Sequence, residues 1–235
     1  MKTWKRFLAL GLVTIITAIM FVGCGSSDIS EGVAKNDYPI TINGVTLNSQ
    51  PTGVAVLSQN IADVILTGGF EATLKAKSED CTQEDLSILP NLTIDDAQEM
   101  KSLGVTLVLV DEAPTEQQTA ALQAQGIQVL AISPAKSRDD CKRLYREVGS
   151  AMVGGNTGYT KGEKACDNVF YTLDDITRLV PSTGTQYSAC YLYDLEGHAA
   201  TGNSLFGSLI SYAGFFNSFG NELNNEIDIN NLQVA

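Results

Sequence analysis

The side chains that commonly perform catalysis are scarce in this sequence, and their spacing forms no catalytic pattern. His198 is the only histidine among 235 residues, which excludes a metal site built from several histidines. The GxSxG, HExxH and P-loop motifs are all absent from the sequence. The acidic pairs Asp95–Asp96 and Asp174–Asp175 have the surroundings of solvent-exposed helix positions. The sequence therefore predicts a protein that is not an enzyme and that has neither a cofactor nor a metal site.

Four of the five cysteines lie far apart in the chain, at Cys81, Cys141, Cys166 and Cys190. Their spacing matches neither a CxxC metal pattern nor a disulfide-rich scaffold. In an oxidising compartment four cysteines allow three disulfide pairings. We interpret them mainly as small buried residues, with one disulfide left open.

The fifth cysteine, Cys24, follows a segment with the pattern of an export signal. A basic tip at Met1–Arg6 precedes an apolar run that is shorter than the about 20 residues of a membrane-spanning helix. The segment Phe21–Cys24 resembles a bacterial lipobox. That resemblance implies removal of residues 1–23, lipidation of Cys24 and anchoring on the extracytoplasmic face of the cell membrane. An ordinary secretory signal with an incidental cysteine is the alternative.

The composition of the chain after residue 23 indicates a flexible tether and a strongly acidic protein. Residues 24–37 are rich in glycine, serine and charge, which predicts a flexible tether. Without residues 1–23 the chain has 12 basic and 27 acidic residues, a net charge of −15. This charge argues against nucleic acid and anionic lipid headgroups as partners, because both bind basic surfaces. A solubilising role of the charge and a cationic ligand are both compatible with it.

Residues 38–135 alternate between strand and helix patterns. Asn43–Gly44 lies between two short apolar segments, 39–42 and 45–47, and predicts a hairpin turn. Strands that alternate with helices of about ten residues predict a parallel sheet. The predicted strands are 53–57, 72–76, 105–110 and 127–132, the predicted helices are 61–67, 93–103 and 116–125, and a polar loop is predicted at 77–84.

Residues 136–181 have a helical period and predict a connector. The helical patterns cover 138–153 and 161–180, and we expect the glycine-rich segment 154–158 to separate them. After the connector, the patterns predict a strand at 187–193, a loop at 194–203 and a helix at 204–212. Residues 182–235 are therefore predicted to begin a second α/β lobe.

The order of these elements resembles the substrate-binding lipoproteins of ABC importers for siderophores, haem and cobalamin. The likeness covers about residues 38–235 and rests on the segments 54–58, 96–110, 122–132 and 201–214. It implies an α/β fold of two lobes with parallel sheets, joined by a long connecting helix. It also implies a monomer that holds a small-molecule ligand between its lobes and delivers it to ABC permease subunits. The ligand class would be an iron-siderophore, haem, a corrinoid or a related metal chelate.

Loops at the carboxyl ends of parallel strands are the expected place for that ligand. Two such loops lie in the first lobe, and one predicted loop lies in the second. Helix N-termini in these loops present free N–H groups that suit ligand oxygens. The alternative for each residue is helix capping and turn formation alone. The candidate ligand-binding residues are Ser58, Gln59, Asn60, Ser78, Asp80, His198, Gly202, Asn203 and Ser204.

Three acidic residues are candidates for docking on a permease, namely Asp96, Glu99 and Asp228. The resemblance gives this role to one acid on the outer surface of each lobe. The matching positions in this sequence are Gln98 and a position near Asn230, so the candidates are neighbouring acids.

The second lobe is predicted to be incomplete, because the chain stops where the family would begin another strand. A truncated chain is favoured over a compact variant, since a parallel lobe that ends there leaves sheet surface uncovered. A ligand sensor or structural lipoprotein with the same fold is the alternative function. A surface-anchored enzyme is a further hypothesis, for which the sequence offers no catalytic motif.

Overall fold

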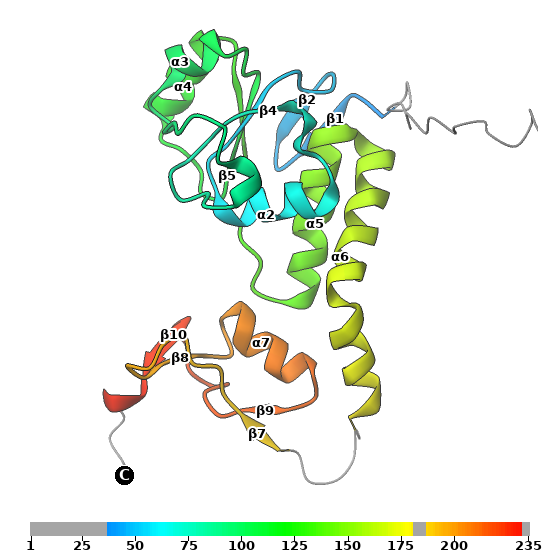
Figure 1. Cartoon of the computed structure of the whole chain (residues 1–235), viewed down its shortest axis with the longest axis vertical. Helices are drawn as coiled ribbons and strands as arrows, with labels where there is room; N and C mark the ends of the chain where they lie inside the picture. Colours follow the sequence, from blue (N-terminus) through cyan, green and yellow to red (C-terminus); the bar gives the residue numbers. More distant parts are fainter. Residues whose placement is uncertain (1–36, 181–186, 232–235) are drawn as a thin grey trace, which may run out of the picture. The chain divides into compact units, whose positions relative to one another are not determined.

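The computed structural model describes residues 37–180 and 187–231 (Figure 1). The predicted signal segment, Cys24 and nearly all of the predicted tether lie outside the described residues. The chain divides into two units, 1–34 and 35–235, and the fold below belongs to the second. Among the described helices, none combines the length and the apolar character that crossing a membrane requires.

A four-stranded parallel sheet forms the centre of the first lobe, with the strand order β4-β3-β5-β6. Its two central strands, β3 and β5, are continuous apolar runs because helices cover both faces of the sheet. All three residues of β3 and all four of β5 are buried. The predicted α/β lobe with a parallel sheet is thus confirmed. The strands are β3 (Val54–Val56), β4 (Leu74–Lys77), β5 (Leu107–Val110) and β6 (Gln128–Ala131).

Successive residues of β3 point into different apolar cores. Val54 and Val56 belong to the core on the side of α2 (Gln59–Gly68) and α5 (Arg138–Val153), whereas Ala55 belongs to the other core. The second core contains side chains of α3 (Ala97–Ser102) and α4 (Glu116–Ala124). Short 3₁₀ turns at η1 (Glu71–Thr73) and η2 (Glu84–Leu86) complete the connections.

The predicted hairpin precedes this sheet. Strands β1 (Ile40–Ile42) and β2 (Val45–Leu47) pair antiparallel around Asn43–Gly44. Both turn residues have positive φ, 48° and 81°, which is the geometry that an Asn-Gly dipeptide favours. The Asn43 side chain donates to the carbonyl oxygen of Ala131 at 2.9 Å, which ties the turn to the end of β6.

The connector differs from its prediction. Helix α6 covers Gly155–Leu179, so the segment 154–158 is not a break, and only Gly154 separates α6 from α5. Glycines within this segment allow the two helices to approach closely. A Cβ atom at Gly158 would lie 2.0 Å from the carbonyl oxygen of Gly149. The glycine-rich sequence therefore reflects helix packing and not a loop.

The second lobe is built from short, two-stranded pairs. Its helix α7 (Leu205–Tyr212) begins one residue after the predicted start, and β7 (Ser188–Ala189) pairs parallel with β9 (Phe216–Asn217). Strand β8 (His198–Ala200) lies inside the predicted loop 194–203 and pairs antiparallel with β10 (Glu226–Asp228), which the turn η3 (Ile229–Asn231) follows. The parallel sheet predicted for this lobe is therefore limited, in the described residues, to one pair.

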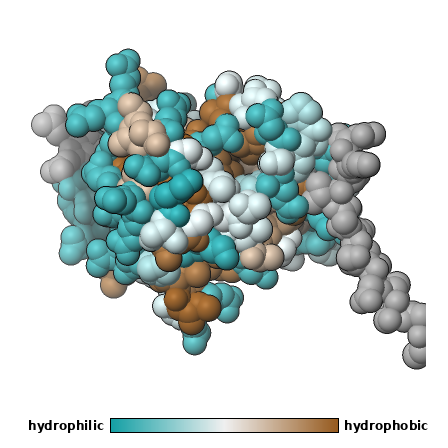
Figure 2. Space-filling model, turned by 90° about the horizontal axis from the view of Figure 1, so that it is seen from above, coloured by the Kyte–Doolittle hydropathy of each residue, from teal (hydrophilic) through white to brown (hydrophobic). Residues whose placement is uncertain are grey.

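The four cysteines of the described residues are all free thiols, so the disulfide that the sequence left open is not formed. Cys81, Cys141 and Cys166 are buried, as expected, and Cys190 is exposed. Burial raises the pKa of the Cys141 thiol to about 11, which keeps it protonated at neutral pH. Hydrophilic residues predominate on the face shown in Figure 2, where hydrophobic residues form scattered patches.

Candidate functional site

A cavity of about 470 Å³ lies in the first lobe, at the carboxyl ends of its parallel strands. Residues that follow β3, β4 and β5 surround it, together with residues near the start of α4. This is the edge of an open α/β sheet at which ligands bind. The lining residues are Leu57, Ser78, Glu79, Asp80, Leu92, Thr93, Ile94, Val110, Asp111, Glu112, Ala113, Pro114 and Gln118.

The cavity combines apolar walls with a negative charge. Its four ionisable residues are all acids, namely Glu79, Asp80, Asp111 and Glu112. No lysine or arginine is among the described residues that line it. Such a cavity suits a ligand with an apolar body and with neutral or cationic groups, because anionic groups would be repelled.

A buried lysine holds the two loops at the rim together. Lys77 is 7% exposed, and its Nζ donates to the side-chain oxygen of Asn91 at 2.6 Å and to the carbonyl oxygen of Ser78 at 3.3 Å. The Leu92 amide donates to the Lys77 carbonyl oxygen at 2.7 Å. The sequence placed Lys77 in a polar loop, but it ends β4 and fixes the position of Ser78.

The predicted residues of the first lobe separate into two groups. Ser78 and Asp80 line the cavity, whereas Ser58, Gln59 and Asn60 do not. Ser58 is buried and caps α2, because its hydroxyl accepts from the Ile61 amide. The same hydroxyl donates to Asp111 Oδ2 at 3.0 Å and so orients a carboxylate of the cavity.

Sequence reasoning missed Asp111 and Glu112. They directly follow β5, so they occupy the same structural position as Ser78 does after β4. The rule that selected the loops after the first two core strands would have selected them after the third. The same rule would not have selected Thr93 and Ile94, because they belong to a loop that precedes a helix.

The predicted residues of the second lobe are occupied by interactions within that lobe. A Cβ atom at Gly202 would lie 2.1 Å from the Gly220 carbonyl oxygen. The Asn203 side chain donates to Leu223 O at 3.1 Å and to Asn225 Oδ1 at 3.0 Å. Ser204 caps α7 by accepting from the Gly207 amide.

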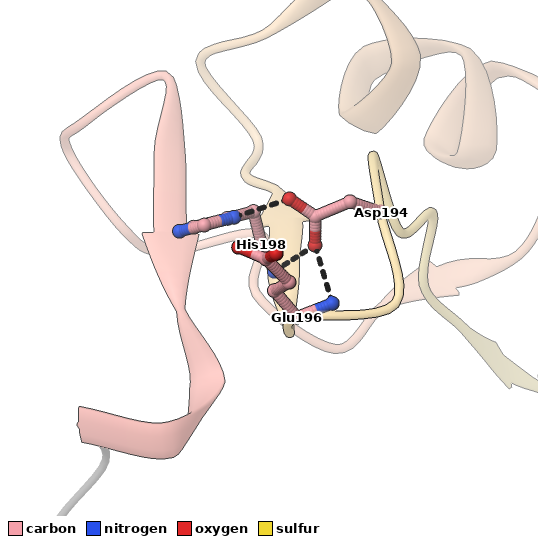
Figure 3. Close-up of side chains that lie close together, drawn as sticks. All are labelled: Asp194, Glu196 and His198. Carbon is pink, nitrogen blue, oxygen red and sulfur yellow. Dashed lines mark hydrogen bonds and ion pairs between the residues drawn. The ribbon is translucent and has the colours of Figure 1, made fainter.

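His198 forms an ion pair with Asp194 on the turn that leads into β8 (Figure 3). The other oxygen of Asp194 accepts from the backbone amides of Glu196, Gly197 and His198, at 2.9, 3.0 and 3.1 Å. These hydrogen bonds, above all the one from the His198 ring, lower the pKa of Asp194 to about 2. Asp194 in turn raises the pKa of His198.

Three aromatic side chains gather beside this turn. The rings of Tyr191 and Phe206 are stacked, with centroids 4.3 Å apart and 5° between their planes. Tyr193 contacts both rings edge to face, at 5.5 and 6.1 Å. Each of the three is about two-fifths exposed, so part of the cluster remains available for stacking.

The docking candidates differ in their availability. Asp96 accepts from the backbone amide and the hydroxyl of Thr93, both at 2.7 Å, and these bonds lower its pKa. Asp228 accepts from the Asn230 amide at 2.9 Å. Glu99 is exposed on α3. Glu99, which is next to the position that the resemblance assigns at Gln98, is thus exposed to solvent.

No protein-family model and no curated protein sequence matches the chain. Several solved structures are similar to it. The periplasmic heme-binding protein HutB of Vibrio cholerae has a TM-score of 0.60 and 16% identity over 76% of this chain and 70% of its own. The heme-binding protein RhuT of Roseiflexus sp. RS-1 has a TM-score of 0.55 and 21% identity over 77% and 71%.

A third similar structure is the periplasmic vitamin B12 binding protein BtuF of Vibrio cholerae, with a TM-score of 0.55 and 14% identity over 76% and 70% of the two chains. The names of all three describe proteins that bind heme or vitamin B12. The chain therefore has the fold of the periplasmic solute-binding proteins.

Proposed function

We propose that this protein is the lipid-anchored substrate-binding component of an ABC importer. The observation that carries the proposal is the first-lobe cavity, which lies at the carboxyl ends of β3, β4 and β5 in a chain with a solute-binding fold. Ser78, Asp80, Asp111 and Glu112 are the polar groups that would contact the solute there. A cavity of about 470 Å³ falls within the usual range for small-molecule sites.

The proposed solute is a metal chelate, either an iron-siderophore, haem, a corrinoid or a related compound. Similar structures are named for binding heme and vitamin B12. The partly exposed rings of Tyr191, Tyr193 and Phe206 support a ligand with a planar ring system, because aromatic faces stack on one another. The four acids of the cavity favour neutral or cationic chelates over those that carry several carboxylates.

The remaining predicted contacts extend this proposal. His198 stands beside the aromatic cluster, and its imidazole would contact a ligand held there. Gly202, Asn203 and Ser204 would act by shaping the start of α7. Ser58, Gln59 and Asn60 would act through the start of α2, where Ser58 orients Asp111. Apart from the contact by His198, the contribution of these residues to binding is indirect.

Delivery of the solute requires anchoring and docking. We propose that Cys24 carries the lipid and that the monomer meets the permease through the acids Asp96, Glu99 and Asp228. A sensor that lacks a transport partner would use the same fold and the same cavity. The two functions differ in whether the chain binds permease subunits, which co-purification with an ABC permease would show.

The test is a thermal-shift and fluorescence titration of the chain with haem, a corrinoid and ferric siderophores. A ligand that binds the folded state raises the melting temperature in proportion to the logarithm of its concentration. Asp80→Asn should weaken binding of the best ligand, by about tenfold where that ligand is cationic. Asp85→Asn changes an exposed acid of η2 outside the cavity and should leave affinity unchanged. The proposal fails if no chelate in the panel shifts the melting temperature.

A further inference from the structure

The turn before β8 and the first residue of β8 bring together three side chains of types that bind metal ions. Asp194, Glu196 and His198 each offer one ligand atom, and these atoms all lie within 4.8 Å of one another (Figure 3). We propose that the three side chains bind a divalent first-row transition-metal ion such as Zn²⁺. Metal–ligand bonds of about 2.0–2.2 Å place neighbouring ligand atoms about 3–4 Å apart. Small side-chain rotations would therefore bring the three atoms to a common ion.

Two of the ligands are already held in place. Asp194 uses one carboxylate oxygen to accept three backbone amides of the turn, which leaves Oδ2 directed at His198 Nδ1 (Figure 3). The turn is also held from its other side, because the Ile229 amide donates to the Gly197 carbonyl oxygen at 2.9 Å. The ion would take the place of the proton that Asp194 and His198 share.

Glu196 supplies the independent observation. Its carboxylate has neither a hydrogen-bond nor an ion-pair partner within residues 37–180 and 187–231, although it lies close to the Asp194–His198 pair (Figure 3). The Asn230 side chain bonds instead to the Glu196 backbone carbonyl, which fixes the backbone and leaves the carboxylate available. The exposed Glu196 carboxylate can therefore turn toward the pair and serve as the third ligand.

Charge and donor type define the class of ion. Two carboxylates and a neutral imidazole carry two negative charges, and Glu226 and Asp228 of β10 add negative potential at the His198 ring. A mixed nitrogen and oxygen set favours Zn²⁺ and its first-row neighbours over Ca²⁺ and Mg²⁺, which prefer oxygen alone. Three protein ligands leave at least one coordination position for water or a second ligand.

The single histidine led the sequence analysis to predict no metal site. A single histidine excludes only sites built from several histidines, whereas the structure combines one histidine with two carboxylates of the same five-residue segment. The inference concerns the metal ion alone and does not depend on the proposed transport function.

The experiment is a calorimetric titration of the intact, untagged chain with ZnCl₂, repeated with CoCl₂ to record the visible absorption of the bound ion. The diagnostic variant is Glu196→Gln, because the exposed Glu196 carboxylate forms no hydrogen bond or ion pair with the described residues. Glu222→Gln is the matched control, since Glu222 is an exposed acid of the same lobe outside the cluster. His198→Ala removes the nitrogen ligand, and circular dichroism shows whether this variant is folded.

We expect one saturable site in the wild-type chain. Glu196→Gln should weaken it at least about tenfold without changing the metal-free melting temperature, and His198→Ala should abolish it. Glu222→Gln should bind as the wild type does. Equal binding by Glu196→Gln and the wild type would overturn the proposal. Non-saturating binding that both glutamine variants reduce equally would also overturn it, since it would show diffuse association with an acidic surface.

Discussion

Gly158 of α6 lies directly against the carbonyl oxygen of Gly149 in α5, and a Cβ atom at Gly158 would come within 2.0 Å of that oxygen. A Cβ atom at Gly149 would meet the Gly158 carbonyl oxygen at 2.3 Å, so the contact is reciprocal. One turn further along, Gly162 has the same relationship to the Tyr145 carbonyl oxygen, at 2.1 Å. Small residues thus set the spacing of the two connector helices.

Gly158→Ala should therefore destabilise the protein. Alanine favours a helix over glycine by about 1 kcal/mol, but the added methyl group meets backbone atoms that cannot rotate away. Separation of the helices should cost about 1–3 kcal/mol net. Urea unfolding followed by circular dichroism measures the difference. Asn168→Ala, on the exposed side of α6, is the control and should be neutral or slightly stabilising. Equal stability of the two variants would contradict the close contact.

These glycines also show why part of the connector was predicted wrongly. Glycine lowers helix propensity, so a segment with three glycines in five residues predicts a loop when read alone. The close contact between α5 and α6 outweighs the low helix propensity of glycine. This contact depends on how the fold places α5 against α6, which no local sequence pattern encodes. By contrast, the apolar period of 138–153 and the run 105–110 encode burial directly, and the structure confirms both elements closely.

Arg138 should stabilise the same helix pair through charge. It is 8% exposed and forms ion pairs with Asp167 at 3.0 Å and Asp174 at 3.3 Å, and its guanidinium stacks over the Phe170 ring at 4.4 Å. Burial opposes the charge, yet hydrogen bonds to Asp174 and Asp167 raise the pKa of Arg138.

Arg138→Met should lower the free energy of unfolding by about 2 kcal/mol, because it removes charge-assisted hydrogen bonds from a buried position. Arg178→Met removes a single exposed ion pair with Asp175 and should have almost no effect. Denaturant titration of both variants in parallel gives the comparison. Similar losses in the two variants would show that the Arg138 network is no stronger than a surface pair.

Ser58 should prove important for stability. It was predicted as a ligand contact with capping as the alternative, and the structure places its hydroxyl between the Ile61 amide and Asp111 Oδ2. Ser58→Ala should therefore cost about 1–2 kcal/mol, the usual loss for a helix cap. Thermal unfolding against Ser87→Ala, an exposed serine near η2, measures this loss. An unchanged melting temperature for Ser58→Ala would contradict the capping role.

Part of the candidate site could be predicted from the sequence, because some of its residues directly follow recognisable strands. Ser78 and Asp80 were found because they follow a recognisable strand, and Asp111 and Glu112 follow an even clearer one. Leu92, Thr93 and Ile94 join the cavity through the backbone bridge between Lys77 and Asn91, a pairing across a loop that no local pattern encodes. Similarly, β8 was read as a loop because its pairing with β10 involves residues far along the chain.

Cys24→Ser should abolish lipid attachment. The wild-type chain, expressed in a bacterial host fed a radiolabelled fatty acid, should incorporate the label and sediment with membranes. Each buried CH₂ group contributes about 0.8 kcal/mol, so loss of the acyl chains should release the variant into the soluble fraction. Export without label in both chains would instead support the ordinary secretory signal.

The Asp194–His198 pair should give the single histidine an unusual titration. Asp194 raises the pKa of His198, so the favourable pairing is complete at low pH and is lost as pH rises through the folded pKa of His198. Asp194 has the opposite dependence, because its contribution is present above its ordinary pKa and is lost as pH falls toward about 2. Both charges therefore coexist from about pH 4 up to the raised pKa of His198.

Proton NMR of the His198 ring, recorded in chelator-treated buffer across pH 4–9, measures this directly. The wild-type pKa should lie above the ordinary histidine value of about 6.5. Asp194→Asn should lower it toward that value and should also weaken the turn, since the carboxylate caps three backbone amides. Glu222→Gln, which leaves the turn intact, should keep the wild-type titration. A His198 pKa that is identical in the wild type and Asp194→Asn would show that the pair does not form in solution.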